Sequence, residues 1–417
     1  MTILDDLERL GDDVADDARE RFRAAAAMIE RYAIEHPQQA FKMLRTFKPV
    51  LLKDGLAMVT RYHDVVQVLT HDEAFSVAPY DEKMRRLAGG FILGTDDGPA
   101  YERDISILRL AAPRSDVPAL SDFMEQTAEE LVAAAGGRLN VADLAKRAPA
   151  RLAARWLGTP GPDEDTLIRW TLAMFEEIFV NVKDDPAIAR AAEEAAAGLR
   201  EYLDDLVRAR KAQQRADDVL GRLIEMQAMP EAAFSDEQIR TNLIGIVCGF
   251  IPTIATATTL AIDQLLARPD ALAGAQRAAR AGDLDGVRAH MWEAMRLAPQ
   301  GPGLLRRASR DFTVAEGTGH ETTIRAGTMT FAATQSAMLD DDVVDDPDEF
   351  RIDRPPHHHL HFGMGMHACF GRFVNAEQIP LIAKALLRRP ELARAPGADG
   401  ELRKAGPFPE SLVVTYA

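Results

Sequence analysis

The side chains best suited to chemistry lie in one short stretch, residues 362–371, which reads F-G-M-G-M-H-A-C-F-G. Cys369 is the only thiol of this stretch, and Cys248 is the only other cysteine in the chain. Gly363 and Gly365 permit a tight loop whose backbone approaches a bound group closely. A thiolate held in such a loop among backbone N–H groups is a good axial ligand for haem iron.

The residues on either side of the thiol agree with this interpretation. Residues 372–387 have the composition of a helix, so Cys369 lies near the positive end of a helix dipole, which favours the thiolate. His367 comes two residues before the cysteine, where a cation meets an anionic group such as a haem propionate.

Two other interpretations of the stretch stay open, a buried structural cysteine in a glycine-rich turn and a zinc ligand. Zinc needs three further ligands, and the sequence contains no Cys-x-x-Cys pair. A nearby histidine tract offers weak metal binding, although a histidine-rich surface loop is the more usual explanation. The tract comprises His357, His358, His359 and His361.

The stretch resembles the haem-binding signature of the cytochrome P450 family. Six residues stand at the positions of that signature: Phe362, Gly363, Gly365, His367, Cys369 and Gly371. The resemblance implies haem b (iron protoporphyrin IX) as the cofactor, with Cys369 as the axial ligand of the iron. It also implies that Phe362, Gly363, His367 and Gly371 contact the cofactor.

Two motifs upstream resemble the same family. Glu293 and Arg296 are three residues apart, which places them on one face of a helix. Such a pair is usually a solvated surface contact, but here it resembles the Glu-x-x-Arg of the family's core, and Arg354 is the expected third member. Arg306 matches the family's arginine that pairs with a haem propionate.

A long helix is expected over residues 235–268, because Ser235 and Gln238 form a capping box and a proline follows Arg268. Its residues 243–262 carry no charge, which meets the length rule for a membrane span. Four threonines and a proline, without flanking aromatic residues, favour a buried central helix instead. This segment resembles the family's helix over the distal face of the haem.

The same helix departs from the family pattern at positions that bear on catalysis. In the family, the glycine matched by Gly249 is followed by an acid and a threonine that help deliver protons to iron-bound dioxygen. Here Ile251 stands in place of the acid and Pro252 in place of the threonine, and Thr253 comes one position later. Isoleucine carries no exchangeable proton and proline lacks an N–H, so either Thr253 or a chain of water molecules does this work, or the reaction does not need it.

The helix expected to contact the propionates departs from the pattern as well. Tyr101 stands where a histidine is usual, and Ile105 stands where an arginine is usual. Arg103 and Arg109 are the candidates to replace that arginine, and Tyr101 stays a candidate for contact with the cofactor.

Length and charge exclude several classes of function. The chain has 417 residues, 47% of them hydrophobic, and a formal net charge of −16. This charge disfavours nucleic acid and anionic membranes as partners. Two widely separated cysteines make no disulfide framework, and the acidic N-terminus lacks the regions of a signal peptide. We therefore expect a cytoplasmic protein without nucleic-acid or membrane partners.

The remaining patterns predict local structure. Residues 14–45 are typical of a helix, 49–62 of a β-hairpin around an Asp-Gly turn, and 77–97 of a long loop. Residues 117–228 are almost continuously helical in pattern.

The expected fold is therefore mainly α with small β-sheets, which in the resembled family is a triangular prism. We expect one cytochrome P450 domain over residues 1–417. Its small β-rich lobe is expected near residues 45–75 and 300–330, and the rest is expected to be helical.

Three functions stay open. The first is a monooxygenase that inserts one oxygen atom from O2 into an apolar small molecule, since residues 300–305 should border the pocket and are rich in Gly, Pro and Leu. No flavin or iron–sulfur segment is present, so a ferredoxin and its reductase are the expected electron source. The basic residues that follow the cysteine are either its docking face or a solvated surface: Arg372, Lys384, Arg388 and Arg389.

The second function is an enzyme that uses a peroxide or hydroperoxide directly, as a peroxygenase or an isomerase. Such an enzyme needs no proton delivery from the positions of Ile251 and Pro252. The third is a non-catalytic haem binder.

Overall fold

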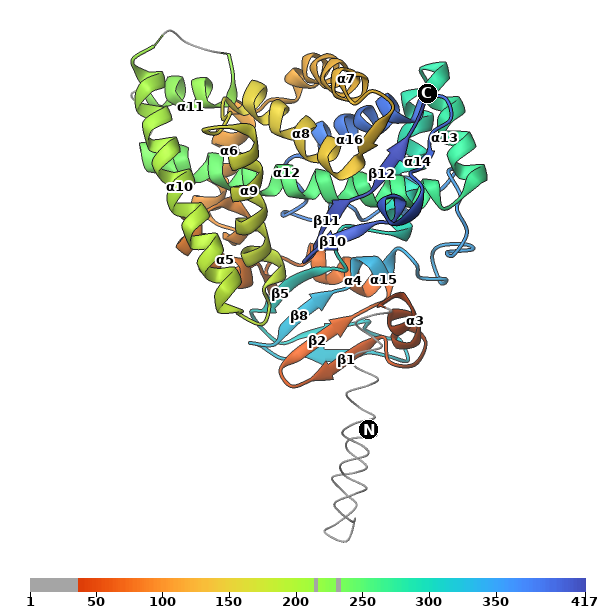
Figure 1. Ribbon diagram of the computed structural model, residues 1–417. Helices are drawn as coiled ribbons and strands as arrows, with labels where there is room; N and C mark the ends of the chain where they lie inside the picture. The colour runs from red at the N-terminus through yellow and green to blue at the C-terminus, as the bar shows by residue number, and fades with distance from the viewer. Residues whose placement is uncertain (1–36, 214–216, 230–233) are drawn as a thin grey trace.

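The computed structural model describes residues 37–213, 217–229 and 234–417. Helices form most of the described chain, and a twisted sheet lies at one end of the molecule (Figure 1). This agrees with the mainly α fold expected from the sequence. The predicted helix over 14–45 lies mostly outside the described residues, whose first helix is α3 (Pro37–Phe47).

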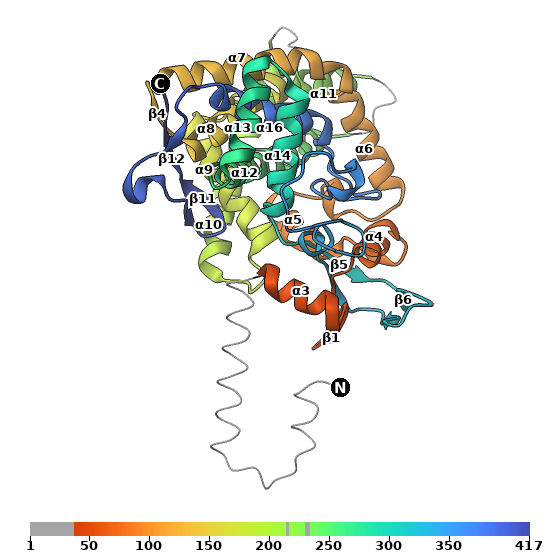
Figure 2. The ribbon, with the colours of Figure 1, turned by 90° about the vertical axis from the view of Figure 1, so that its right-hand side faces the viewer.

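The helix α12 (Asp236–Leu266) runs through the middle of the structure, as Figure 1 shows. Its 31 residues span ~46 Å. The predicted capping box is present, because the backbone N–H of Gln238 donates to Oγ of Ser235 and the backbone N–H of Ser235 donates to Oε1 of Gln238. Figure 2 looks nearly along α12, with α13 and α14 nearest the viewer.

Among the described residues, α12 is the one helix long and apolar enough to cross a membrane, and 83% of its most apolar window is buried inside the protein. The expected buried central helix is therefore confirmed. Its neighbours in space are α8, α9, α10, α13, α14 and α16. A helix surrounded in this way needs no polar face, which explains a sequence without charges over 243–262.

The other helices cover α12 and close the ends of the molecule. Those before it are α4 (Tyr62–Thr70), α5 (Ala78–Leu87), α6 (Pro99–Ala111), α7 (Val117–Ala134), α8 (Val141–Leu152), α9 (Glu164–Phe175), α10 (Pro186–Lys211) and α11 (Val219–Gln227). Those after it are α13 (Pro269–Ala281), α14 (Leu284–Leu297), α15 (Thr334–Ala337) and α16 (Arg372–Leu387). The π-helical turns η3 (Ala153–Leu157) and η4 (Glu176–Val180) extend α8 and α9.

The main sheet has the strand order β1-β2-β8-β5-β3. Its strands are β1 (Val50–Lys53), β2 (Leu56–Val59), β8 (Met329–Ala332), β5 (Leu304–Ala308) and β3 (Phe75–Ser76). The predicted hairpin is confirmed: β1 and β2 pair antiparallel across Asp54 and Gly55, whose φ angles of 49° and 76° suit a two-residue turn of type I′. The sheet thus joins the two sequence segments that were expected to form the β-rich lobe.

Three smaller sheets complete the structure. They are β4-β12-β9, from Arg138–Asn140, Val413–Thr415 and Ala393–Arg394; β10-β11, from Arg403–Ala405 and Phe408–Ser411; and β6-β7, from Phe312–Val314 and Thr322–Ile324. Strand β4 interrupts the region that the sequence predicts as almost continuously helical. It forms because β12, far away in the sequence, supplies its hydrogen-bonding partner.

The prediction of a long loop over 77–97 is wrong. Ten of these residues form α5, which begins with Pro79 in its first turn, and residues 92–94 form the short helix η1 (Ile92–Gly94). The apolar face of α5 consists of Tyr80, Met84 and Leu87, which are buried against the rest of the core. Two arginines and no regular apolar repeat hide this helix in the sequence.

A buried charge network connects α14 to the chain that leads into the cysteine loop. Glu293 accepts hydrogen bonds from Nε and Nη2 of Arg296, both at 2.8 Å, and from Nε of Arg354 at 3.0 Å. The side chains of Glu293 and Arg296 are fully buried. Arg354 is therefore the third member, as predicted, and the surface interpretation of the pair is wrong.

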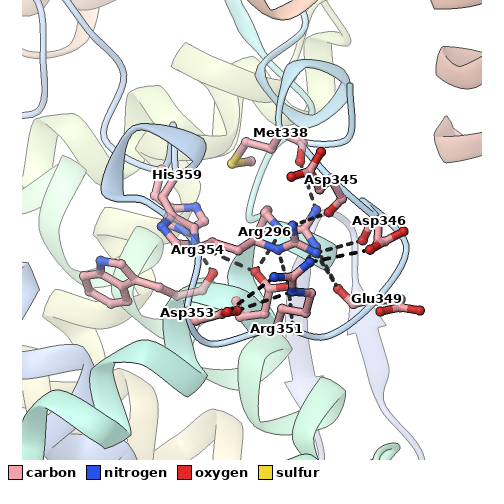
Figure 3. Close-up of polar contacts among 12 residues, drawn as sticks. Arg296, Met338, Asp345, Asp346, Glu349, Arg351, Asp353, Arg354 and His359 are labelled. Carbon is pink, nitrogen blue, oxygen red and sulfur yellow. Dashed lines mark hydrogen bonds and ion pairs between the residues drawn. The ribbon is translucent and has the colours of Figure 1, made fainter. Parts of the chain in front are cut away.

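The same network binds the backbone of the segment after α15. Arg296 donates to the carbonyl oxygens of Met338 and Glu349, and Arg354 donates to those of Asp345, Asp346 and Glu349 (Figure 3). Burial alone would raise the pKa of Glu293. Hydrogen bonds from Arg296 and from the backbone N–H of Arg351, together with His359, whose Nε2 lies 3.7 Å from the carboxylate, outweigh it and lower that pKa.

Replacement of Glu293 by alanine is expected to lower the free energy of unfolding by ~3–5 kcal/mol and to impair haem retention, because it leaves two buried guanidinium groups without their carboxylate. Asp205→Ala is the matched control, since Asp205 pairs with Arg208 at the same i,i+3 spacing in solvent. Its expected cost is below about 1 kcal/mol. Denaturant unfolding with haem absorbance measures both, and equal costs would contradict the expected role of the network.

Candidate active site

A cavity of about 1920 Å³ lies against α12. The cysteine loop, η1, α5, α6, η4 and the face of the main sheet that carries Leu305 and Phe331 contribute much of the rest of its wall. Residues 300–305 all line it, so the prediction that this segment borders the pocket is confirmed.

The cysteine loop is closed by its own backbone. The N–H of Cys369 donates to the carbonyl oxygen of Phe362 at 2.8 Å, and the N–H of Ala368 donates to that of Gly365 at 3.2 Å. Gly365 has a φ of +74°, and a Cβ atom at this position would lie 2.3 Å from the carbonyl oxygen of Leu69. Only glycine fits there, which explains the spacing of glycines ahead of the thiol.

The thiol of Cys369 lies on the cavity wall, immediately before α16. Burial raises its pKa, while a hydrogen bond from the backbone N–H of Gly371 and the charge of Arg372 act in the opposite direction. The helix end therefore does not by itself produce a thiolate in the free chain. A coordinated metal cation supplies the missing stabilisation, because a coordinating thiol loses its proton to the metal.

Two buried cationic or basic groups near the loop have polar atoms without a partner among the described residues. Nε of Arg306 has none, although the side chain is only 3% exposed and Nη1 donates to the carbonyl oxygen of Leu305. Nε2 of His367 has none either. Burial and the charge of Arg306 lower the pKa of His367 to about 4, so His367 is neutral without an added anion. An anionic group such as a propionate fits both side chains.

On α6, the structure gives Tyr101 a specific contact. Its hydroxyl donates to the carbonyl oxygen of Met366 at 2.9 Å, which ties α6 to the cysteine loop, and its ring packs edge-on against His367. Of the two candidate arginines, Arg103 pairs with Asp104 and does not line the cavity. Arg109 lines the cavity one helical turn beyond Ile105 and has no ion pair with a described residue.

Along α12, residues spaced by four line the cavity: Gly245, Gly249, Thr253 and Ala257. A Cβ atom on Gly249 would meet nothing within 4 Å, so the cavity reaches the backbone there. The hydroxyl of Thr253 donates to the carbonyl oxygen of Gly249 at 2.6 Å. The spacing of small residues by four in the sequence could have predicted this strip. The comparison with the family motif pointed to Ile251 and Pro252 instead.

Two of the four catalytic candidates lie away from the cavity. Ile251 is completely buried, and neither it nor Pro252 lines the cavity. Cys248 also faces the core, where its thiol contacts the sulfur of Met174 and burial raises its pKa to about 12. Thr253 and Gly249 are therefore the two candidates that reach the distal side of the cavity.

Of the histidine tract only His357 is exposed, so the prediction of a surface loop fails for the other three histidines. His358 and His359 are mostly buried beside the Glu293 network, and Nε2 of His361 contacts the carbonyl oxygen of Trp292 at 3.0 Å. Burial lowers the pKa of His361 to about 3. Among the described residues, the only cluster with metal-ligand spacing is Asp340, Asp341 and Asp342, and it contains no histidine. The buried histidines of the tract instead pack between the Glu293 network and the cysteine loop.

Comparison with known proteins decides what this arrangement is. The family described as cytochrome P450 matches residues 171–414, more than half of the chain. The chain belongs to the cytochrome P450 family. Its cofactor is accordingly haem b, and the cysteine, the cavity and the two basic side chains with an unpartnered nitrogen, Arg306 and His367, fit that group.

The similarity extends over nearly the whole chain. A steroid C26-monooxygenase of Mycolicibacterium smegmatis is 27% identical over 396 residues, which cover 92% of this chain and 94% of the relative. Among solved structures, the P450-like fold is matched by CalO2 with a TM-score of 0.80 at 22% identity, over 92% of this chain and 97% of that one.

A shorter match links part of the chain to a much longer protein. A bifunctional dioxygenase–epoxy alcohol synthase of Pyricularia oryzae is 35% identical over 102 residues, which are 24% of this chain and 9% of that protein. The P450 family and the relatives named as oxygenases make this protein an oxidoreductase, so the interpretation as a non-catalytic haem binder falls away. The roles of the individual site residues stay predictions.

Cys369→Ala is expected to remove the thiolate-type absorption of the reduced carbon monoxide complex and to leave the fold intact, because the loop closes through backbone hydrogen bonds. Cys248→Ala is the matched control. It removes the other thiol of the chain from the core side of α12 and should keep the spectrum. A thiolate spectrum that survives in Cys369→Ala would contradict the assignment of the axial ligand.

Proposed function

We propose that this protein is a haem-thiolate monooxygenase that takes electrons from a ferredoxin and its reductase. It inserts one oxygen atom from O2 into a largely apolar small molecule. We further propose that it works in the cytoplasm, as one P450 domain, without membrane or nucleic-acid partners. The observation that carries the proposal is that Cys369 and Thr253 line the same cavity.

The residues around that cavity suit the proposed reaction. Haem, when bound, supplies the activation of dioxygen and the oxidation of the substrate. Cys369 is the expected iron ligand, and Arg306 and His367 are the expected partners of the propionates, with Phe362, Gly363 and Gly371 in contact through the loop. Tyr101 holds that loop in place through its carbonyl contact.

Thr253 is the proposed proton carrier on the distal side. Its hydroxyl is the polar side-chain group that α12 presents to the cavity, and the carboxylates on the cavity wall come from α5 and the η4 region instead: Asp81, Glu82, Glu177 and Asp184. A hydroxyl bonded to the carbonyl of Gly249 holds a water molecule or passes a proton without carrying charge itself.

The surface around the cysteine supports a revised docking face for the ferredoxin. Lys384 pairs with Glu125, and Arg388 and Arg389 pair with Glu129, so these three cations are already neutralised by α7. Three other cations line the cavity beside the cysteine loop and form no ion pair with a described residue: Arg109, Arg114 and Arg372. An acidic partner meets uncompensated charge there.

The proposal predicts sustained product formation with a ferredoxin, its reductase and O2 in the presence of catalase, which removes leaked peroxide. Activity that appears only when a peroxide is supplied would contradict the monooxygenase. The substrate for this assay is chosen by the shift that it causes in the ferric haem spectrum.

Two observations favour a second candidate, an enzyme that isomerises or uses a hydroperoxide. The family's acid and threonine are replaced by Ile251 and Pro252. The shorter match names an epoxy alcohol synthase in one chain with a dioxygenase. An epoxy alcohol has the same composition as an unsaturated hydroperoxide, so such a conversion needs no external electrons and no protons from a relay.

Thr253→Ala separates the two candidates. In the monooxygenase, the product formed per electron pair should fall by about tenfold or more, because a positioned proton carrier is lost. Hydroperoxide-driven turnover should change little. Thr259→Ala is the matched control, because Thr259 makes the same contact, to the carbonyl of Ala255 at 2.7 Å, away from the cavity. Equal losses in both variants would show that the hydroxyl supports the helix only.

A further inference from the structure

One face of the main sheet forms part of the cavity wall, and the register of the strands arranges its side chains in two rows. Leu305 pairs with Phe331, and Arg307 pairs with Met329; across the next ladder, Phe331 pairs with Met58 and Met329 with Leu56. Paired residues of neighbouring strands point to the same face. The inner row is therefore Leu305, Phe331 and Met58, the outer row is Arg307, Met329 and Leu56, and all six line the cavity.

The two rows differ in their distance from the cysteine loop. The side chain of Leu304 lies 3.5 Å from the position of a Cβ atom on Gly363, so the beginning of β5 adjoins the loop. Arg307 comes three residues later, ~10 Å further along the strand. The wall is thus apolar near the loop and carries a cation at its outer edge.

Arg307 is exposed and forms no ion pair or side-chain hydrogen bond within the part of the chain that the structure describes. Its neighbour Arg306 points to the other side of the strand and is buried. On α5, which packs against β5, the cations that line the cavity have partners: Lys83 pairs with Asp184 at 2.8 Å, and Arg86 pairs with Glu193 at 2.9 Å. Both also contact the buried carboxylate of Glu177.

The segment at the end of η4 adds exposed apolar side chains to the cavity wall, beside carboxylates that are already paired with cations of α5. Val180 and Val182, at the end of η4 and just after it, line the cavity and are 37% and 67% exposed. A ligand that extends outward from the cysteine loop along the sheet therefore meets the apolar inner row and then the uncompensated guanidinium of Arg307. Guanidinium groups bind carboxylates through paired hydrogen bonds.

We propose that the substrate is an amphipathic carboxylic acid whose carboxylate binds Arg307 and whose apolar chain lies along the inner row toward Cys369. This inference rests on the proposed function, because it assumes that the cavity holds the substrate beside the haem. It applies to the monooxygenase and to the hydroperoxide enzyme alike. The inference states the chemical class of the substrate. It also states that the end of the substrate far from its carboxylate is the one that reaches the haem.

The test is a titration of the ferric haem protein with dodecanoic acid and, separately, with methyl dodecanoate, followed by the change in haem absorbance. The acid is expected to bind more tightly than the ester. Arg307→Gln should raise the Kd of the acid by about fivefold and leave that of the ester unchanged. Added salt should weaken binding of the acid to the wild-type protein more than to this variant.

Two matched controls remove one positive charge from the same sheet region. Arg310→Gln removes an exposed guanidinium that pairs with Glu73 at 2.9 Å and does not line the cavity. Lys53→Gln removes an exposed ammonium at the far end of the outer row, which also does not line the cavity. Neither variant should change the Kd of the acid.

Three results would overturn the inference: equal Kd values for acid and ester, an equal loss in Arg307→Gln for both probes, or a loss in the two controls as large as in Arg307→Gln. A protein that binds neither probe would also overturn it. The proposed function is tested separately by the carbon monoxide spectrum and by product formation with the ferredoxin system, so the two can fail independently.

Discussion

The burial of the Glu293 carboxylate is the constraint on which the position of the cysteine loop depends. A charge without solvent needs several donors, and here Arg296, Arg354 and the backbone N–H of Arg351 provide them. The two guanidinium groups then fix the carbonyl groups of the segment before the loop. Trp292, the residue next to Glu293, packs edge-on against Phe362 at the start of the loop. Trp292 and Glu293, which are neighbours on α14, thus help to position the cysteine loop against the cavity.

The central helix α12 meets a different requirement, since it must be buried on nearly all sides and still border a reaction space. It does so with small residues on the strip that faces the cavity and with larger apolar residues elsewhere. Pro252 lies on the buried side and removes one backbone N–H there. Thr253 provides the hydroxyl on the cavity side and returns its hydrogen bond to Gly249. The polar group that α12 presents to the cavity therefore comes from Thr253 and not from position 252.

Some cations around the cavity form ion pairs within the protein, and others do not. Lys384 near the end of α16, and Arg388 and Arg389 just after it, are neutralised by α7. Lys83 and Arg86 of α5 are neutralised by the η4 region and α10. The guanidinium groups on the cavity wall that form no ion pair with a described residue lie beside the cysteine loop, at Arg109, Arg114 and Arg372, and at the mouth, at Arg307. Uncompensated positive charge is thus placed where an external partner or a ligand is expected. Because the protein as a whole carries a net charge of −16, these sites differ in sign from the rest of the molecule.

The sequence alone indicated the class of the protein, because Cys369 and the glycines around it resemble the haem-binding signature of the family. The need for glycine at Gly365 was decided by the fold, which brings the carbonyl oxygen of Leu69 against this position. It also predicted α12, its cap and the β1-β2 hairpin, which rest on signals within a few residues. The Glu293 network was predicted from the family resemblance, but its burial was decided by segments sixty residues apart. Strand β4, helix α5, the packed histidine tract and the face of β5 that carries Arg307 depended on partners distant in sequence. Which residues of α12 reach the cavity was likewise decided by rotation of the helix in the fold, which a motif alignment does not contain.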